Sequence, residues 1–350
     1  MRYPEFLKDG GSIGFPAPSF GPTIEPYKSA FHKAMEYFRE QGYLPYPGTN
    51  SEESCGIGIS NLPVHCGGEL TAMYADEDID TLISCGGGEL MCEILDYVDF
   101  GRIRKLPPKW FMGYSDNTNF TYLLATMCDT ASIYGPCADK FGAEELHASV
   151  TDALALLKGE KLTMSSYDAY ETEPLKSPEN PLAPIHATEA RIHRIFDGKD
   201  FHDDARKWSG QLECSGRLIG GCMDCLVNLL GTVYDNTHSF QRSYASDGFI
   251  WFLEACDLNV FDMRRAMWQM DHAGWFRDVR AFLIGRPENG APILNLDAWE
   301  AFLPIARKYR VPMILEMDLG HVPPMMPLIV GSYATVTAQG NDCRIAMELK

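Results

Sequence analysis

Short apolar runs alternate with amphipathic segments along most of the chain, and a glycine often lies at the boundary between an apolar run and the amphipathic segment that follows it. Residues 110–112 predict a buried strand, and Gly113 lets the backbone turn sharply after it. Apolar side chains then recur at the spacing of one helix face, from Phe120 to Met127. Repetition of this pattern predicts an α/β fold with a parallel sheet.

The same periodicities predict the remaining elements. In the first half they indicate a strand running into a turn at 12–19, a helix at 27–41, an irregular stretch at 46–68, a strand at 79–85 and a helix at 149–157. In the second half they indicate a strand entering a glycine turn at 214–222, helices at 223–230, 262–273 and 298–309, strands at 248–256, 279–285 and from 311, and a closing antiparallel pair at 331–339 and 344–349.

Periodicity is lost between residues 161 and 208, where four prolines and many charges interrupt the pattern. Such a stretch is typical of a linker or a surface insertion. We therefore predict an N-terminal α/β domain at 1–165, a linker with an inserted surface element at 166–210, and a C-terminal domain at 211–350. A length of 350 residues leaves room for two domains.

Charge and composition exclude several partners. A net charge of −18 repels phosphate backbones and anionic lipid, so we expect no nucleic-acid or membrane binding. The N-terminus has no apolar signal segment, and no apolar run approaches the roughly 20 residues that span a bilayer. We therefore expect a cytoplasmic protein.

The cysteines predict reduced thiols and no metal site. Eleven is an odd number, and the cysteines are scattered through apolar segments. Cys222 and Cys225 have CxxC spacing, but a zinc site needs two further ligands, and none is evident at matching spacing. We expect neither a metal nor an organic cofactor.

Two glycine-bounded turns could carry chemistry. Ser115 follows the strand at 110–112, at a turn that could expose its hydroxyl to a substrate, although Ser115 or Asp116 could equally be an ordinary helix cap. Gly86, Gly87 and Gly88 follow the strand at 79–85, where they could hold an anion or simply form a tight turn. Neither GxGxxG nor Walker spacing is present, which argues against nucleotide phosphates.

Glu254 and His321 stand at comparable places, each at or after the end of a predicted strand. A serine nucleophile needs a base to take its proton, and the base needs a carboxylate to orient it. Ser115, His321 and Glu254 could supply these three roles. Glu254 and His321 could also have purely structural roles. Their order along the chain does not decide this, because a triad is recognised by its geometry.

Several blocks together resemble the LD-carboxypeptidase family of serine peptidases (peptidase family S66), closer to its microcin-immunity, MccF-like type. The resemblance covers nearly the whole chain, and the matching blocks are 11–19, 83–89, 113–116, 216–221, 230–232, 252–254 and 318–324. It implies a Rossmann-like (flavodoxin-like) N-terminal domain with the nucleophile. It also implies a C-terminal domain with a small β-barrel-like sheet and helices, which carries the acid and the base.

The resemblance also assigns roles to residues. Ser115 would be the nucleophile, Glu254 the triad acid and His321 the base, with an oxyanion hole of backbone N–H groups from Asp116 and from Gly87 or Gly88. It further implies a homodimer.

The family resemblance leaves two substrate classes open. One is a murein tetrapeptide cut at an L-to-D bond, and the other is a peptidyl- or aminoacyl-adenylate conjugate of the microcin-immunity type. Glu89 and Cys222 are the tentative substrate-binding residues, and Leu90, Cys222 and Cys256 depart from the family pattern. A non-catalytic protein that binds a peptide or nucleotide conjugate is the alternative of another class.

Overall fold

Two compact units make up the chain in the computed structural model, which describes residues 1–55 and 58–350. The first unit contains Met1–Lys161 and Glu173–His186, and the second contains Leu162–Thr172 and Ala187–Lys350. The backbone passes from one unit to the other three times between residues 161 and 187. These passages fall where the sequence loses its periodicity, so the stretch that reads as a linker contributes to both units.

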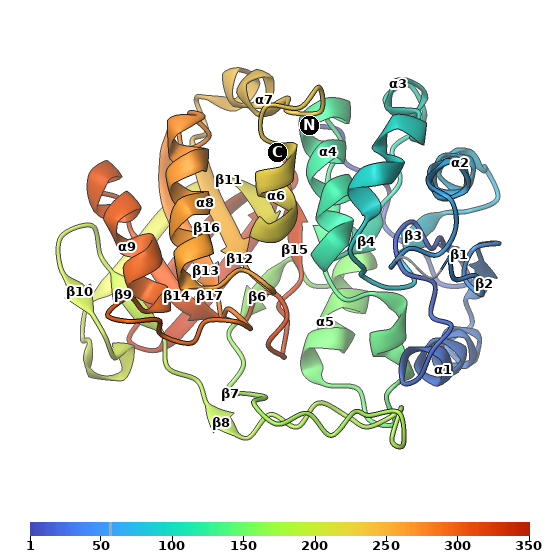
Figure 1. Cartoon of the computed structure of the whole chain (residues 1–350), viewed down its shortest axis with the longest axis horizontal. Helices are drawn as coiled ribbons and strands as arrows, with labels where there is room; N and C mark the ends of the chain where they lie inside the picture. Colours follow the sequence, from blue (N-terminus) through green and yellow to red (C-terminus); the bar gives the residue numbers. More distant parts are fainter. Residues whose placement is uncertain (56–57) are drawn as a thin grey trace. The chain divides into compact units, whose positions relative to one another are not determined.

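The first unit is built on a parallel sheet with the strand order β2-β1-β3-β4-β5 (Figure 1). This order is that of flavodoxin-like sheets, in which ligands bind beyond the carboxyl ends of the strands where the chain order reverses. The turns that follow β1, β3 and β4 therefore share one edge. The strands are β1 (Ser12–Phe15), β2 (Leu44–Pro47), β3 (Thr81–Ile83), β4 (Phe111–Gly113) and β5 (Ser132–Tyr134).

Helices of the first unit follow the amphipathic segments of the sequence. The predicted helix at 27–41 is α1, and its periodic apolar side chains are buried. The expectation of an irregular stretch at 46–68 is wrong at its end, because Pro63 opens a helix that buries Cys66, Leu70 and Tyr74 on one face. Positions 56–57 of that stretch lie outside the described residues. The helices are α1 (Tyr27–Glu40), α2 (Pro63–Ala75), α3 (Phe100–Ile103), α4 (Thr118–Cys128) and α5 (Ala148–Leu157), with short 3₁₀ segments at Met91–Tyr97, Ser115–Asn117 and Ala138–Gly142.

The second unit contains a mixed sheet with the order β10-β9-β14-β13-β12-β11-β16-β17-β6. Strands β11 to β14 pair in parallel, and the strands on either side pair antiparallel. The strands of this unit are β6 (Thr163–Ser165), β9 (Arg194–Phe196), β10 (Phe201–His202), β11 (Gln211–Cys222), β12 (Phe249–Glu254), β13 (Val279–Gly285), β14 (Met313–Met317), β15 (Leu328–Val330), β16 (Tyr333–Gln339) and β17 (Asp342–Glu348), with a separate pair β7 (Ala169–Tyr170) and β8 (Glu189–Ala190).

The α/β class is confirmed, but the second sheet is not a closed barrel. Within the described residues its order begins at β10 and ends at β6, so the sheet is open. Its parallel centre needs helices to connect and cover it. Those helices are α6 (Met223–Leu229), α7 (Thr237–Tyr244), α8 (Val260–His272) and α9 (Ala298–Tyr309), and a further 3₁₀ turn spans Ala205–Lys207.

Strand β12 lies in the core of the second unit. All six of its residues are buried. Trp251 stacks on Trp275 with 5.7 Å between ring centroids, and Phe276 meets Trp251 edge-on. A strand buried on both faces is rigid, so the residue at its carboxyl end, Glu254, is held in a defined place.

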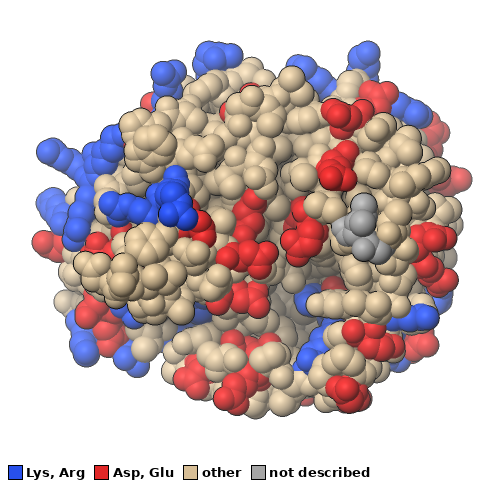
Figure 2. All heavy atoms as spheres, viewed as in Figure 1, with Lys and Arg blue, Asp and Glu red and all other residues tan. Residues whose placement is uncertain are grey.

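Surface charge is unevenly distributed. Figure 2 shows Lys and Arg side chains gathered over the region of α9, where Arg307, Lys308 and Arg310 end that helix, while Asp and Glu are scattered over the rest of the face. Cations at a helix C-terminus interact favourably with its dipole. Among the described residues, no helix has both the length and the apolar character needed to cross a membrane.

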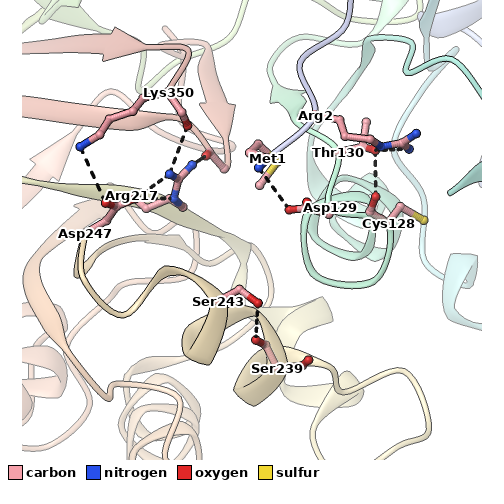
Figure 3. A network of polar contacts seen from close by, with 11 residues as sticks. Met1, Arg2, Cys128, Asp129, Thr130, Arg217, Ser239, Ser243, Asp247 and Lys350 are labelled. Carbon is pink, nitrogen blue, oxygen red and sulfur yellow. Dashed lines mark hydrogen bonds and ion pairs between the residues drawn. The ribbon is translucent and has the colours of Figure 1, made fainter.

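A buried ion pair ties the middle of β11 to the segment before β12 and to Lys350 in the second unit. Arg217 is 2% exposed and lies 2.5 Å from the Asp247 carboxylate (Figure 3). The same guanidinium donates to the backbone carbonyls of Gly331 and Lys350 and lies over the ring of Tyr244. In the first unit, Figure 3 shows the corresponding anchoring of the chain start by Arg2 and Thr130.

Replacement of Arg217 tests this anchor. Arg217→Met removes the guanidinium from the mostly buried Asp247 carboxylate and leaves it only the more exposed Lys350 ammonium at 3.8 Å, so we expect a loss of about 3 kcal/mol in unfolding free energy. Tryptophan fluorescence during urea unfolding measures it, since five of the six tryptophans lie in the second unit. The matched control is Arg277→Met at an exposed position, where no loss is expected. Equal stability of the two variants would show that the ion pair does not anchor the chain end.

Candidate active site

Ser115 occupies a strained turn between β4 and α4. Its φ is 61°, in the left-handed region that non-glycine residues rarely adopt. The backbone N–H of Ser115 donates to the Tyr134 hydroxyl at 3.3 Å, and the side chain is half-buried. A serine held in this conformation at a sharp strand-to-helix turn has the geometry of a nucleophile elbow. The structure thus favours the elbow over an ordinary capping serine.

The side chain of Asp116 holds the turn at Ser115 in place through hydrogen bonds. Its buried carboxylate accepts hydrogen bonds from the backbone N–H of Met91 at 2.8 Å, from Nδ2 of Asn119 at 3.0 Å and from the Ser19 hydroxyl. These groups come from the turn after β1, from the segment after the glycine loop and from α4. The side chain of Asp116 is therefore a structural tie, while its backbone N–H lies in the first turn of the helical segment, where anions are stabilised.

The glycine loop after β3 lies directly against Ser115. A Cβ atom added to Gly87 would lie 3.2 Å from both Cβ and Oγ of Ser115, so a side chain there would crowd the hydroxyl. Hydrogen bonds fix the loop, among them one from Nδ2 of Asn117 to the carbonyl of Gly86 at 2.8 Å and one from the N–H of Phe20 to the carbonyl of Gly87 at 2.9 Å. The loop therefore brings rigid backbone next to the place where a substrate carbonyl would meet Ser115.

Glu254 and His321 form a hydrogen-bonded pair in the second unit. Nδ1 of His321 lies 2.9 Å from Oε2 of Glu254, and an ionised carboxylate can only accept, so Nδ1–H is the donor. Glu254 is 1% exposed, whereas His321 is half-buried. Gly320 has a φ of 88°, and a Cβ there would lie 2.4 Å from Oε2 of Glu254. Only glycine allows this close approach of the loop to the carboxylate.

A second buried ion pair positions the loop that carries His321. The Asp318 carboxylate accepts from the Arg286 guanidinium and from the backbone N–H of Tyr167 at 2.8 Å. Arg286 also lies over the Tyr170 ring, 4.4 Å from its centroid. Burial raises the pKa of Asp318, and the Arg286 guanidinium opposes that rise. Sequence reasoning gave these residues no role, although Asp318 stands three residues before His321 and Arg286 follows a strand end.

Asp224 was also missed, and it supports the loop after Glu254. Its carboxylate accepts from three consecutive backbone N–H groups, of residues 256–258, at 3.0 to 3.1 Å. The Cys222 thiol donates to the same carboxylate at 3.3 Å. An acidic residue in the first turn of α6 was the available signal, but its partners are about thirty residues away in the chain.

The remaining residues singled out in the sequence have clear positions. Cys222 pairs with Glu254 in the register of β11 and β12, and it is buried. A hydrogen bond to Cys225, burial and nearby negative charge raise the pKa of the Cys222 thiol. Glu89 is exposed, and Gly88 adopts a φ of 142° beside Ser19. The structure thus joins Ser115 with the glycine loop in one unit and Glu254 with His321 in the other.

Comparison with known proteins agrees with this architecture. The family model for the LD-carboxypeptidase N-terminal domain matches residues 13–135, and that for the LD-carboxypeptidase C-terminal domain matches residues 215–336. The two matches together cover most of the chain. The chain belongs to the LD-carboxypeptidase family, a family of peptidases.

Relatives and solved structures resemble the chain over almost its full length. A probable murein peptide carboxypeptidase of Bacillus subtilis (strain 168) is 22% identical, with 95% of this chain and 91% of the relative aligned. An MccF-like protein from Bacillus anthracis str. Ames superposes with a TM-score of 0.78 at 20% identity, covering 99% of this chain and 100% of the other. The microcin C7 self-immunity protein MccF in complex with aspartyl sulfamoyl adenosine gives 0.77 at 19% identity, covering 99% and 98%.

The anchoring role of Asp116 can be tested by Asp116→Asn. The amide keeps one acceptor oxygen and presents N–H groups to donors, so we expect a local loss of about 2 kcal/mol. Hydrogen–deuterium exchange of peptides covering residues 86–91 and 115–119 should accelerate about 30-fold, the factor that corresponds to this loss. The control is Glu77→Gln at an exposed position. Unchanged exchange in the Asp116 variant would contradict the anchoring role.

Proposed function

We propose that this protein is a serine carboxypeptidase that hydrolyses an amide bond near the C-terminus of a small peptide through an acyl-enzyme. The observation that carries the proposal is the left-handed backbone of Ser115, which lies against the Gly87 loop. Strain of this kind, about 1–3 kcal/mol, persists where the surrounding structure enforces it, and it clusters at active sites. The pair of Glu254 and His321 supports the same function by supplying an oriented base.

Each step of the reaction uses a group whose local geometry suits it. His321 takes the hydroxyl proton of Ser115 through Nε2 while Ser115 Oγ attacks the scissile carbonyl. Backbone N–H groups of Asp116 and of the loop at Gly87 and Gly88 stabilise the oxyanion. Protonated His321 then gives its proton to the leaving amine. Water, activated by the same histidine, hydrolyses the acyl-enzyme and releases Ser115.

Glu254 serves this reaction by holding one tautomer of His321. Because Nδ1–H donates to the buried carboxylate, the lone pair of the histidine resides on Nε2, where a base needs it. The carboxylate also stabilises the imidazolium that forms when Ser115 loses its proton. No metal or organic cofactor is required at any step.

A murein tetrapeptide, cut at its L-to-D bond, is the substrate class we favour. The support is the murein peptide carboxypeptidase among the relatives, which aligns over most of both chains. The MccF structures with aminoacyl sulfamoyl nucleosides support the alternative, a hydrolase of peptidyl- or aminoacyl-adenylate conjugates. A cytoplasmic location and a homodimer belong to the same proposal, and light scattering of the purified protein would measure the second.

Loss of the Ser115 hydroxyl should abolish turnover. Ser115→Ala removes the nucleophile, and replacement of a catalytic serine lowers kcat by up to about 10⁶-fold. We expect hydrolysis to fall at least 10³-fold by this reasoning and labelling by a fluorophosphonate to disappear. Ser243→Ala, an exposed helical serine, is the control and should keep both activities. A protein that never labels would instead be the non-catalytic binding protein.

Substrate class is decided by mass spectrometry of two parallel reactions. One contains a murein tetrapeptide and the other an aspartyl sulfamoyl-adenosine conjugate. We expect loss of the terminal D-alanine from the tetrapeptide, because cleavage there matches the family's carboxypeptidase activity. Cleavage of the adenosine conjugate alone would replace this substrate class with the immunity-type alternative.

A further inference from the structure

Three side chains with metal-binding chemistry converge beside the proposed base. Cys256, Glu288 and His321 each offer a ligand atom, and these atoms all lie within 4.8 Å of one another. The Cys256 thiol lies 3.5 Å from Oε2 of Glu288. Sulfur at about 2.3 Å and oxygen at about 2.1 Å from a tetrahedral zinc ion lie about 3.6 Å apart. One pair of the cluster already has the spacing of zinc ligands.

The backbone around the cluster is fixed before any ion binds. The N–H of Glu288 donates to the carbonyl of Ala255 at 3.1 Å, and the N–H of Asn289 donates to the carbonyl of Cys256 at 3.2 Å. The Asn289 side chain adds a third bond, to the carbonyl of Asp257 at 2.8 Å. These bonds join the loops after β12 and β13, so Cys256 and Glu288 stay close together. A site organised in advance needs little further ordering when it binds.

Asp224 provides additional hydrogen bonds to the loop after β12. It accepts the backbone N–H groups of residues 256–258, which sets the direction in which Cys256 leaves β12. Glu288 is exposed, while Cys256 and His321 are half-buried. An ion in solution can therefore reach the cluster from the side of Glu288.

His321 has the outer partner that a metal-binding histidine requires. Such histidines almost always donate their second ring N–H to a carboxylate or a carbonyl, which fixes the tautomer and raises ligand basicity. Glu254 accepts from Nδ1 of His321 at 2.9 Å. The nitrogen that would coordinate a metal is therefore Nε2, the same atom that accepts the proton of Ser115 in the proposed reaction.

We infer that Cys256, Glu288 and His321 form a binding site for Zn²⁺, with water in the fourth position and Glu254 as the outer partner of the histidine. Thiolate and imidazole together select zinc over magnesium or calcium, which prefer oxygen ligands. On binding, the Cys256 thiol releases its proton to water and coordinates as thiolate. The cluster was not anticipated from the sequence, which places its members 32 and 33 residues apart.

Zinc in this site inhibits the enzyme. This consequence rests on the proposed function, because the ion occupies the Nε2 lone pair with which His321 would deprotonate Ser115. Inhibition requires no change of fold, since the ligands are already close. Removal of the ion by a chelator restores the base.

Cobalt titration of the purified full-length protein tests the site independently of activity. Co²⁺ bound by a thiolate gives a charge-transfer absorption in the near ultraviolet, and we expect one equivalent to produce it. Cys256→Ser should lose this absorption, and Glu288→Gln should raise the Kd for Co²⁺ at least about 10-fold. Cys92→Ser, which removes an exposed thiol in the first unit, is the control and should keep it. Full absorption in the Cys256 variant would overturn the site.

Fluorophosphonate labelling of Ser115, with and without Zn²⁺, tests the inhibition. Zinc should suppress labelling of the wild-type protein, and a chelator should restore it. The zinc concentration for half suppression should rise at least about 100-fold in Cys256→Ser, measured against that variant's own zinc-free rate. Cobalt binding with unchanged labelling would overturn the inhibitory role. Absence of labelling in the metal-free wild type would contradict the proposed function instead, and the cobalt spectrum would still decide the site.

Discussion

The hydrogen bond between Glu254 and His321 is the interaction on which the chemistry of the second unit depends. A buried carboxylate is costly unless it is paired, and His321 supplies that partner at 2.9 Å. The bond requires a glycine at position 320, because any side chain there would collide with the carboxylate. It also selects the histidine tautomer whose Nε2 carries the lone pair. Both the proposed hydrolysis and the inferred zinc site use that one atom.

The first unit meets a different constraint, which is the cost of holding Ser115 in a left-handed backbone. Asp116 and Asn117 offset this cost by tying the elbow to the turn after β1, to the glycine loop and to α4. Neither of these supporting roles requires contact with a substrate. Supporting hydrogen bonds of this kind can hold substrate-contacting groups to within a fraction of an ångström, which is the accuracy that catalysis needs.

The loops around His321 place two further metal ligands beside it, so in the inferred site a metal ion competes with a proton for its Nε2 atom. Cys256 and Glu288 lie on two loops that hydrogen-bond to each other, and Asp224 fixes the first of them. Replacement of either side chain would leave these backbone bonds in place. Zinc sensitivity could therefore vary among proteins of this fold without any change in the residues proposed for catalysis.

The sequence by itself determined the α/β class and the main helices and strands, and its family resemblance supplied the proposal that Ser115, Glu254 and His321 act as nucleophile, acid and base. Periodicity reports which face of a segment is buried, and strand ends followed by glycine mark where functional groups emerge. The wrong predictions arose where a local pattern was masked or where the outcome depended on pairing between distant segments. The helix at Pro63–Ala75 was hidden by glycine, serine and cysteine around it, and the open edge of the second sheet depends on strand order.

Only the tertiary structure decided which distant residues meet. The left-handed φ of Ser115 distinguishes an elbow from a helix cap, and residue type alone does not specify it. Asp224 and Asp318 are ordinary acidic residues in the sequence, and they gain their roles from backbone N–H groups and a guanidinium far along the chain. Cys256, Glu288 and His321 form a cluster because parallel strands end at one edge of the sheet. Chain folding creates that proximity, and no local pattern encodes it.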